Sequence, residues 1–219
     1  MNKKYTLWVI FMIFALMVNA QSKKKKSKQK PAYTIGISSG YFSHGKMFEN
    51  SVNKFSGFGT FQIEGQKLFK SKKTGLSLGY FSAKSDFTKN NITTDESRFA
   101  LMLNYNLMYN ILHSKNTTGL YVGGFLGALY DQGKQLYRSN FAFPFYTTYV
   151  AGWLGPKAEY LYQINPKIAL SACSQFGLVE FGKQSNKRDD PNLPKRNQTE
   201  TYVDFAKRIN LNLGITFTL

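Results

Sequence analysis

Residues 208–219 read RINLNLGITFTL and carry the clearest periodicity in the chain. Apolar side chains occupy every second position from Ile209 to Leu219, and Asn, Gly and Thr lie between them. A strand with a period of two has one apolar face and one polar face. The apolar face meets a second sheet in a soluble protein, whereas in an outer-membrane β-barrel it meets lipid and the polar face lines the interior.

Composition favours β structure in a single domain. The 219 residues include 19 Phe, 14 Tyr and 18 Gly, with 29 Lys and Arg against 12 Asp and Glu. Aromatic residues are common in strands, and this length suits one domain or one barrel. No apolar run of about 18 residues follows the amino terminus, so we expect no membrane-spanning helix. The lone Cys173 excludes an intramolecular disulfide, and we expect it to be an inert, packed side chain.

The first 31 residues have the pattern of an export signal followed by a basic leader. Lys3 and Lys4 precede a twelve-residue apolar core, residues 7–18, and Val18-Asn19-Ala20 fits a signal-peptidase site, which predicts a signal peptide over residues 1–20. Residues 21–31 hold six lysines between 23 and 30, so we expect a disordered leader. It either attaches to an anionic partner, such as lipid headgroups or a cell-wall polymer, or is a solvated leader that keeps the chain soluble before insertion. Nucleic acid is not an expected partner of an exported chain.

Residues 32–219 divide into eight alternating segments of a length that suits tilted transmembrane strands. These predicted strands are 32–42, 55–69, 74–83, 98–109, 119–130, 147–162, 167–179 and 208–219. The connections between them alternate between long and short. The long ones are 43–54, 84–97, 131–146 and 180–202, and the short ones are 70–73, 110–118 and 163–166.

This pattern predicts an all-β fold, an eight-stranded antiparallel transmembrane up-and-down β-barrel in the outer membrane of a Gram-negative bacterium. Both termini and the short turns would lie in the periplasm. Closure would remove the unpaired strand edge that lipid cannot solvate. A soluble lipocalin-like barrel is the rival fold, and it would reverse the facing of every strand.

Aromatic residues near the predicted strand ends indicate two interfacial girdles. The members expected at the periplasmic side are Tyr33, Phe69, Tyr109, Tyr162 and Phe217, and those expected at the outer side are Tyr41, Tyr80, Phe99, Tyr130 and Tyr149. The segment 119–130 is apolar at both sets of alternate positions, so its facing is not assigned.

Polar residues at inward positions predict a filled barrel interior. The candidate polar and ionic cluster consists of Glu64, Arg98, Asn104, Lys157, Glu159 and Arg208, and Thr60, Gln62, Asn106, Asn210 and Asn212 are also expected to point inward. Enclosed ionisable groups need partners, so we expect the two glutamates to compensate the three cations. An eight-stranded barrel is just wide enough for its own side chains. We therefore expect a structural plug, with a small-solute porin as the alternative.

Catalysis has little support in the sequence. His44 follows Ser43 in the first long connection, and His113 precedes Ser114 in a short turn. A membrane-embedded lipid A acyl hydrolase or acyltransferase would need a histidine beside a serine nucleophile, and adjacent residues on a strand point apart. No metal-ligand spacing or cofactor motif is present. We expect a non-enzymatic protein with no cofactor and no metal, and the lipid-modifying enzyme is the alternative.

Four features together resemble a known family: the signal ending at Ala20, the Lys-rich leader, LGPKAEY at 154–160 and NLNLGITF at 210–217. They look like the outer-membrane β-barrel domain proteins of Bacteroidota, which are similar in architecture to OmpA- and OmpX-type barrels and include PorT-like proteins of a secretion system. The resemblance covers residues 32–219 and implies insertion by the barrel-assembly machinery. The assembly signal of such barrels most often ends in Phe, whereas this chain ends in Leu219 with Phe217 on the same face. The expected partners are outer-membrane lipid and an external ligand or membrane partner bound by the loops, above all 180–202.

Overall fold

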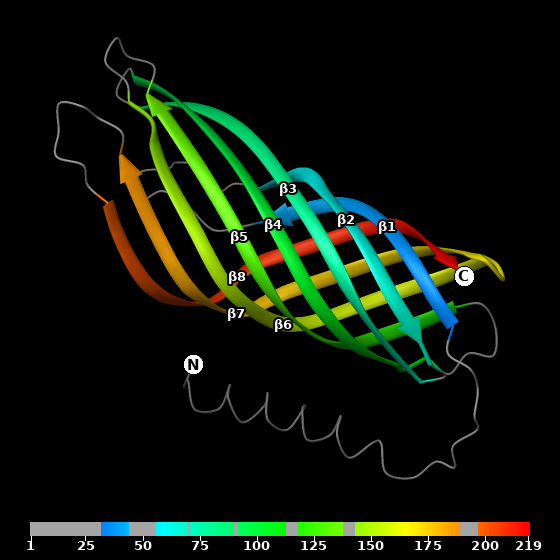
Figure 1. Cartoon of the computed structure of the whole chain (residues 1–219). Helices are drawn as coiled ribbons and strands as arrows, with labels where there is room; N and C mark the ends of the chain where they lie inside the picture. The colour runs from blue at the N-terminus through cyan, green and yellow to red at the C-terminus, as the bar shows by residue number, and fades with distance from the viewer. Residues whose placement is uncertain are drawn as a thin grey trace, which may run out of the picture. The chain divides into compact units, whose positions relative to one another are not determined.

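The computed structural model contains eight antiparallel strands that close into a barrel (Figure 1). It describes residues 32–43, 56–69, 71–89, 92–112, 118–137, 143–188 and 197–219. The strands are β1 (Ala32–Ser43), β2 (Ser56–Leu68), β3 (Lys72–Lys89), β4 (Ile92–Asn110), β5 (Thr118–Tyr137), β6 (Phe145–Asn165), β7 (Ile168–Arg188) and β8 (Asn197–Thr218). Each strand pairs with the next along the chain, and β8 pairs with β1, so the predicted fold is confirmed.

Two parts of the sequence prediction fall outside the described residues. These are the signal peptide and basic leader at residues 1–31, and the two histidines, His44 and His113. Within the described ranges, no helix has the length and apolar character that crossing a membrane requires.

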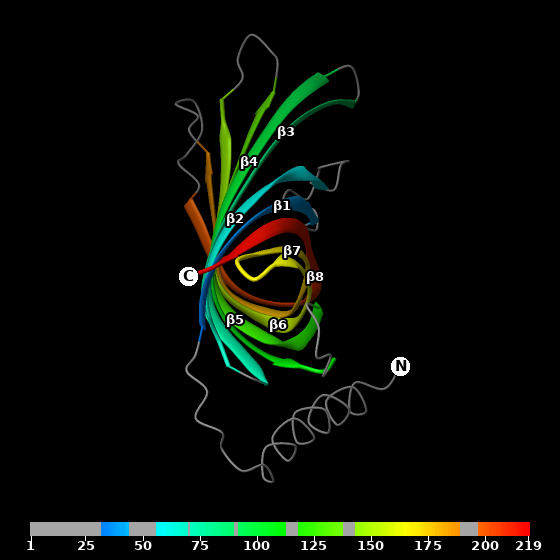
Figure 2. The same ribbon diagram turned by 90° about the vertical axis from the view of Figure 1, so that its right-hand side faces the viewer.

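Strand structure continues far beyond the segments predicted from the sequence. The expected loop at 84–97 is largely strand, since β3 and β4 remain paired as far as Lys89 and Ile92. The expected loops at 131–146 and 180–202 are wrong in the same way, because β5, β7 and β8 extend into them. Figure 2 shows β3 and β4 rising well past the closed ring. These extensions were missed because polar residues occur on both of their faces, and a polar strand lacks the alternation that marks a half-buried one.

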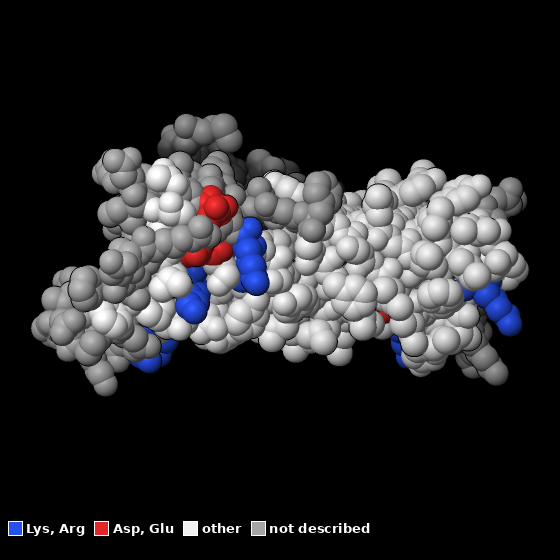
Figure 3. Space-filling view, turned by 90° about the horizontal axis from the view of Figure 1, so that it is seen from above, with Lys and Arg blue, Asp and Glu red and all other residues white. Residues whose placement is uncertain are grey.

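The barrel has an apolar exterior and a polar interior. Along β4, the odd-numbered residues from Leu101 to Leu107 are exposed, and the even-numbered residues from Met102 to Met108 are buried. The closing strand repeats this pattern, with Leu213 71 % exposed and Asn212 3 % exposed. In Figure 3, Lys, Arg, Asp and Glu gather toward the two ends of the visible face, and its middle is almost free of them. The rival soluble barrel would have the opposite facing.

The facing of β5, which the sequence did not assign, follows from its burial. Tyr121, Phe125 and Leu129 are buried, whereas Leu126 and Ala128 are exposed on the outside. The inward positions of this strand are thus as apolar as its outward positions. For this reason its sequence shows no alternation of apolar and polar residues.

The outward aromatic residues include Tyr33, Tyr80, Tyr162 and Phe217, as predicted for the girdles. Tyr149 was wrongly included, because it is 8 % exposed and its ring packs edge-on against Tyr202 with 5.4 Å between centroids. Tyr149 and Tyr162 have opposite parity on β6 and therefore point to opposite faces. The prediction had grouped them by nearness to strand ends.

The pairing between neighbouring strands changes register at bulges. The pairing of β1 with β2 shifts after Gly40, and the pairing of β7 with β8 shifts between Gly177 and Val179. Opposite the second shift lies Ala206, whose φ of 55° is left-handed, a conformation typical of one residue in a bulge. Gly40 permits closure, because a Cβ there would lie 1.9 Å from the Leu211 carbonyl oxygen on β8.

Candidate functional site

The barrel interior contains a cluster of ion pairs near the end that carries the short turns. Lys157 Nζ lies 2.7 Å from Glu64 Oε1, and Asn106 Nδ2 donates to the same oxygen at 2.8 Å. Lys73 Nζ lies 2.5 Å from Glu159 Oε1. Each carboxylate thus has a lysine partner, and we call these five residues the lower ionic cluster.

A second group, which we call the upper ionic cluster, lies nearer the strand extensions. Asp131 accepts a two-pronged contact from Arg98, with Nε at 2.6 Å, and a hydrogen bond from Arg208 Nη1 at 3.0 Å. Arg208 also donates to both oxygens of Glu180, with Nη2 at 2.7 Å from Oε1. Tyr202 Oη donates to Glu180. Two guanidinium groups therefore face two carboxylates, and the cluster carries no net formal charge.

Tyr202 lies on β8 before residue 208, outside the segment that the sequence predicts to span the membrane. Its hydroxyl group donates a hydrogen bond to Glu180 in the upper ionic cluster.

An apolar layer separates the two ionic clusters. The order along the inward face of β4 is Arg98, Ala100, Met102, Asn104 and Asn106, so the apolar side chains lie between the charged layers. The core of this layer consists of Phe42, Phe81, Ala100, Met102, Phe125, Leu129 and Trp153. The Phe125 and Trp153 rings meet edge to face, with their centroids 4.5 Å apart.

Amides fill the space beside the apolar layer. Asn212 Nδ2 donates to Gln62 Oε1 at 3.0 Å, and Asn210 Nδ2 donates to Gln175 Oε1 at 3.2 Å. Thr60 Oγ1 donates to Asn212 Oδ1 at 2.9 Å. These contacts join side chains of β2, β7 and β8 and leave the interior occupied by side chains.

The structure places all six predicted cluster residues in the interior but divides them between layers. Glu64, Lys157 and Glu159 belong to the lower ionic cluster, and Arg98 and Arg208 belong to the upper ionic cluster. Asn104 lies beside Gly127 and Trp153 in the apolar layer. The expected pairing of Arg98 and Arg208 with the two glutamates is wrong, because these arginines pair with Asp131 and Glu180.

The partners that sequence reasoning missed are Lys73, Asp131, Glu180 and Tyr202. Lys73 was placed in a turn, although it shares the parity of the inward residue Ser77 on β3. Asp131 follows Leu129 with the same parity on β5, so extension of the strand by one residue would have revealed it. Alternation along β7 does not predict that Glu180 points inward. The register shift after Gly177 changes the inward positions of this strand from odd-numbered to even-numbered residues.

The interior geometry suits stabilisation of the barrel wall. Each ionic group contacts an opposite charge, and among the described residues no group of three His, Cys, Asp or Glu side chains is arranged to hold a metal ion. What the arrangement provides is a plug that is charged at two levels and apolar between them.

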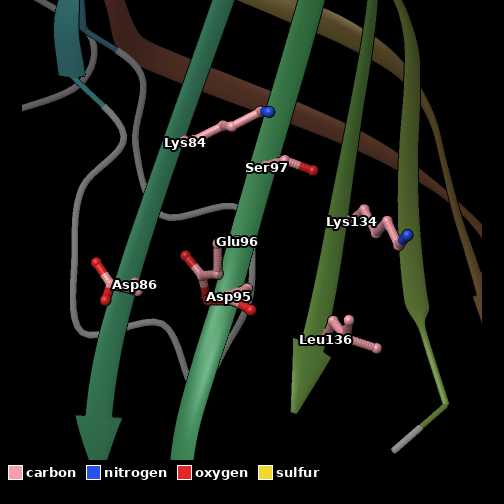
Figure 4. A pocket seen from close by; sticks show the side chains of 7 residues that line it. All are labelled: Lys84, Asp86, Asp95, Glu96, Ser97, Lys134 and Leu136. Carbon is pink, nitrogen blue, oxygen red and sulfur yellow. The ribbon is translucent and has the colours of Figure 1, made fainter. Parts of the chain in front are cut away.

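The strand extensions carry two hollows. One, of about 540 Å³, is formed by β3, β4 and β5 and lined by Lys84, Asp86, Asp95, Glu96, Ser97, Lys134 and Leu136 (Figure 4). Glu96 is the buried member, and Gln135 Nε2 donates to it at 3.0 Å. The other, of about 530 Å³, is lined by Gln132, Tyr146, Thr148, Ser185, Asn186, Lys187, Gln198 and Thr199. Most of the residues that line the two hollows are polar or charged, although their apolar atoms also face the space.

Three solved structures align with most of this chain, and the one with a TM-score above 0.5 is an outer-membrane protein. A major outer membrane protein from Thermus thermophilus aligns with 87 % of this chain and 100 % of its own, at 12 % identity and a TM-score of 0.55. Neisserial surface protein A aligns with 87 % of this chain and 100 % of its own, at 11 % identity and a TM-score of 0.45. The attachment invasion locus protein Ail of Yersinia pestis aligns with 86 % of this chain and 97 % of its own, at 16 % identity and a TM-score of 0.41.

No protein-family model and no curated protein matches the chain. The solved structures do not support the narrower resemblance to Bacteroidota and PorT-like proteins. This chain and the Thermus protein share their architecture. The chain has the fold of a small outer-membrane β-barrel.

Proposed function

We propose that this chain is a non-enzymatic outer-membrane β-barrel protein that acts as a scaffold for interactions outside the membrane. The observation that carries the proposal is the inverted polarity of the barrel. Leu76, Leu103, Leu126 and Leu213 point outward and are more than half exposed, whereas Lys157 and Arg208 point inward and are buried. Large exposed apolar belts are unfavourable in water and are required in lipid.

The membrane part of this proposal is tested by heat-modifiability together with fractionation. A closed barrel resists detergent at room temperature, so the unboiled protein should migrate faster in electrophoresis than the boiled protein. The protein should also sediment with the outer membrane. A soluble periplasmic protein with no mobility shift would refute the proposed location.

The orientation that we propose has the short turns, the start of β1 and the end of β8 in the periplasm. The extensions of β3 to β8 would then project outward. This follows the usual arrangement of outer-membrane barrels, in which short turns are periplasmic. A protease added to intact cells should therefore cut between residues 188 and 197 and spare the turn at Pro166.

We expect the barrel to exclude small solutes. Trp153 is 0 % exposed at the centre of the apolar layer, and the amides and ion pairs occupy the remaining interior. Ions avoid a dry apolar layer because of the cost of desolvation. The purified protein in a planar bilayer should show no stable conductance steps, and regular single-channel openings would favour the porin alternative.

The interaction role is supported by the strand extensions. They hold two hollows lined mostly by polar and charged residues on a β scaffold, and binding residues are commonly positioned on such scaffolds. We propose an external polar ligand or a membrane partner rather than a reaction on lipid. Replacing His44 with Ala should leave the lipid A profile of the cells unchanged, whereas loss of a modified lipid A species would favour the acyl hydrolase or acyltransferase. The link to the Bacteroidota family also remains a proposal, based on the sequence segments alone.

A further inference from the structure

The outer surface of β1, β2 and β3 near the short turns carries two adjacent cross-strand rows of residues. Tyr33 pairs with Lys67, and Lys67 pairs with Thr74, so these three residues form one cross-strand row. Two residues farther along each strand, Ile35 pairs with Gly65, and Gly65 pairs with Leu76. Residues two apart share a face, so a polar row lies directly beside an apolar row on the barrel exterior.

The apolar row contains a notch at Gly65. Ile35 and Leu76 flank the glycine with exposed side chains, and a Cβ built on Gly65 meets nothing within 4 Å. The groove that results has a volume of about 480 Å³, and Tyr105 and Leu219 add to its apolar walls.

Close packing of the strands does not require a glycine at this position. The neighbouring Gly75 is different, because a Cβ there would lie 2.4 Å from the Gly65 carbonyl oxygen. The fold therefore explains Gly75 but leaves the open space at Gly65 without a structural cause. Such a space on a lipid-facing wall is available to a chain of methylene groups.

The polar row supplies a cation and two hydroxyl groups at one end of the notch. Lys67 Nζ lies 5.6 Å from the Tyr33 ring centroid and 5.4 Å from the Phe69 ring centroid, so cation–π contacts hold the ammonium group at this end. No acidic side chain is among the described residues that line the groove. Lys67 is the one basic side chain among the described residues that line the groove. The backbone N–H of Leu219, the last residue, donates to the Tyr33 carbonyl oxygen at 2.9 Å, so an anionic group would bind on the Lys67 side of the row.

We propose that this groove binds one phospholipid of the leaflet on the side of the short turns. The phosphate would contact the row of Tyr33, Lys67 and Thr74, and one acyl chain would occupy the notch at Gly65. The inference rests on the proposed membrane insertion, which brings phospholipid to this surface. Interfacial lysines attract anionic headgroups, and burial of methylene groups stabilises the bound chain.

A phospholipid matches the groove better than a second copy of this chain. A two-fold contact centred on Gly65 would bring the same patch of each copy together, since a symmetric dimer interface is self-complementary. Two Lys67 ammonium groups would then approach each other, and no acidic side chain among the described lining residues would compensate them. An amphiphile presents its anion to the lysine and its chain to the notch.

The test is native mass spectrometry of the purified full-length protein in detergent, titrated with dioleoyl phosphatidylglycerol. Gly65→Leu should fill the notch and lower the affinity for the first lipid about tenfold, because several methylene contacts are lost. Lys67→Gln should lower it about fivefold, as expected for loss of one basic group near a headgroup. Ala128→Leu and Lys167→Gln are the matched controls, since both positions are exposed elsewhere on the barrel, and they should retain wild-type affinity.

Heat-modifiability of each variant shows separately that the barrel is folded, and outer-membrane sedimentation tests the proposed location. With both of these intact, equal lipid affinity in all variants would refute the groove while leaving the proposed function standing. A wild-type dimer that Gly65→Leu converts to a monomer would mean that a second copy fills the groove, and it would overturn the proposal. Displacement of the phospholipid by equimolar purified lipid A would overturn the choice of phospholipid.

Discussion

Replacing Asp131 with Asn should destabilise the barrel strongly, because this carboxylate holds two buried arginines. Arg98 contacts both of its oxygens, and Arg208 donates to it at 3.0 Å. Arg98 and Asp131 are both 0 % exposed at their side chains. The substitution keeps the side-chain shape but removes the negative charge that both guanidinium groups contact.

The expected loss is about 3–5 kcal/mol in the free energy of unfolding, the usual cost of removing one partner from a buried ion pair. With a urea m-value of roughly 2 kcal/mol/M, the midpoint of unfolding should fall by about 2 M. The assay is urea unfolding of the folded protein in detergent micelles, followed by the loss of the fast-migrating unboiled band. Asp86→Asn is the matched control, because Asp86 is exposed on β3, and its effect should stay within about 0.5 kcal/mol.

A double variant tests the cause of the loss. Arg98→Gln combined with Asp131→Asn removes one charge of each sign and leaves Arg208 with Glu180 as a neutral pair. The double variant should therefore be more stable than Asp131→Asn alone, and the two changes should be non-additive by more than about 1 kcal/mol. If the two effects simply add, or if Asp131→Asn alone unfolds at the wild-type midpoint, charge compensation in this cluster is not what stabilises the barrel.

Three further predictions concern closure, the plug and the extensions. Gly40→Ala should abolish the heat-modifiable band, because its Cβ would lie 1.9 Å from a carbonyl oxygen of β8, whereas Gly65→Ala meets nothing within 4 Å and should fold normally. Trp153→Ala should cost about 3–5 kcal/mol in urea unfolding, as for other buried aromatic truncations, and wild-type stability would contradict a packed apolar layer. Deletion of residues 186–197 with a short turn in their place should leave the heat-modifiable band intact, since only the tips of β7 and β8 are removed, and loss of that band would mean that the tips are needed for folding.

The closed part of the barrel was predictable because burial on one face imposes a period of two. In residues 99–109 of β4 and 209–217 of β8, each outward residue is aliphatic or aromatic, and polar residues such as Asn106 and Asn212 occur at inward positions, so strand identity and facing followed together. The same reasoning failed for Tyr149, where nearness to a strand end was given more weight than parity. Within a continuous strand, parity is fixed by the backbone, and it decides the facing.

The ends of the strands and the ion-pair partners were harder to predict, for a physical reason. Beyond the closed ring, the strands are stabilised by backbone hydrogen bonds between neighbours such as Lys84 and Ser97, and this pairing does not depend on apolar side chains. Which charged side chains form an ion pair depends on the height along the barrel axis at which each of them enters the interior. Bulges such as that beside Ala206 shift this level without any mark in the hydrophobic pattern.

The layered interior also bears on where function resides. An ion that crossed the barrel would have to disrupt the pairs around Glu64, pass Trp153 and Phe125 in the apolar layer, and then disrupt the pairs around Asp131. Each ionic layer is already compensated by its own side chains, so neither has a net charge to attract a permeating ion, and the apolar layer offers no polar replacement for lost water. The interior is thus built to hold the wall in one shape. We therefore assign the proposed recognition role to the outer wall of the barrel and to the strand extensions.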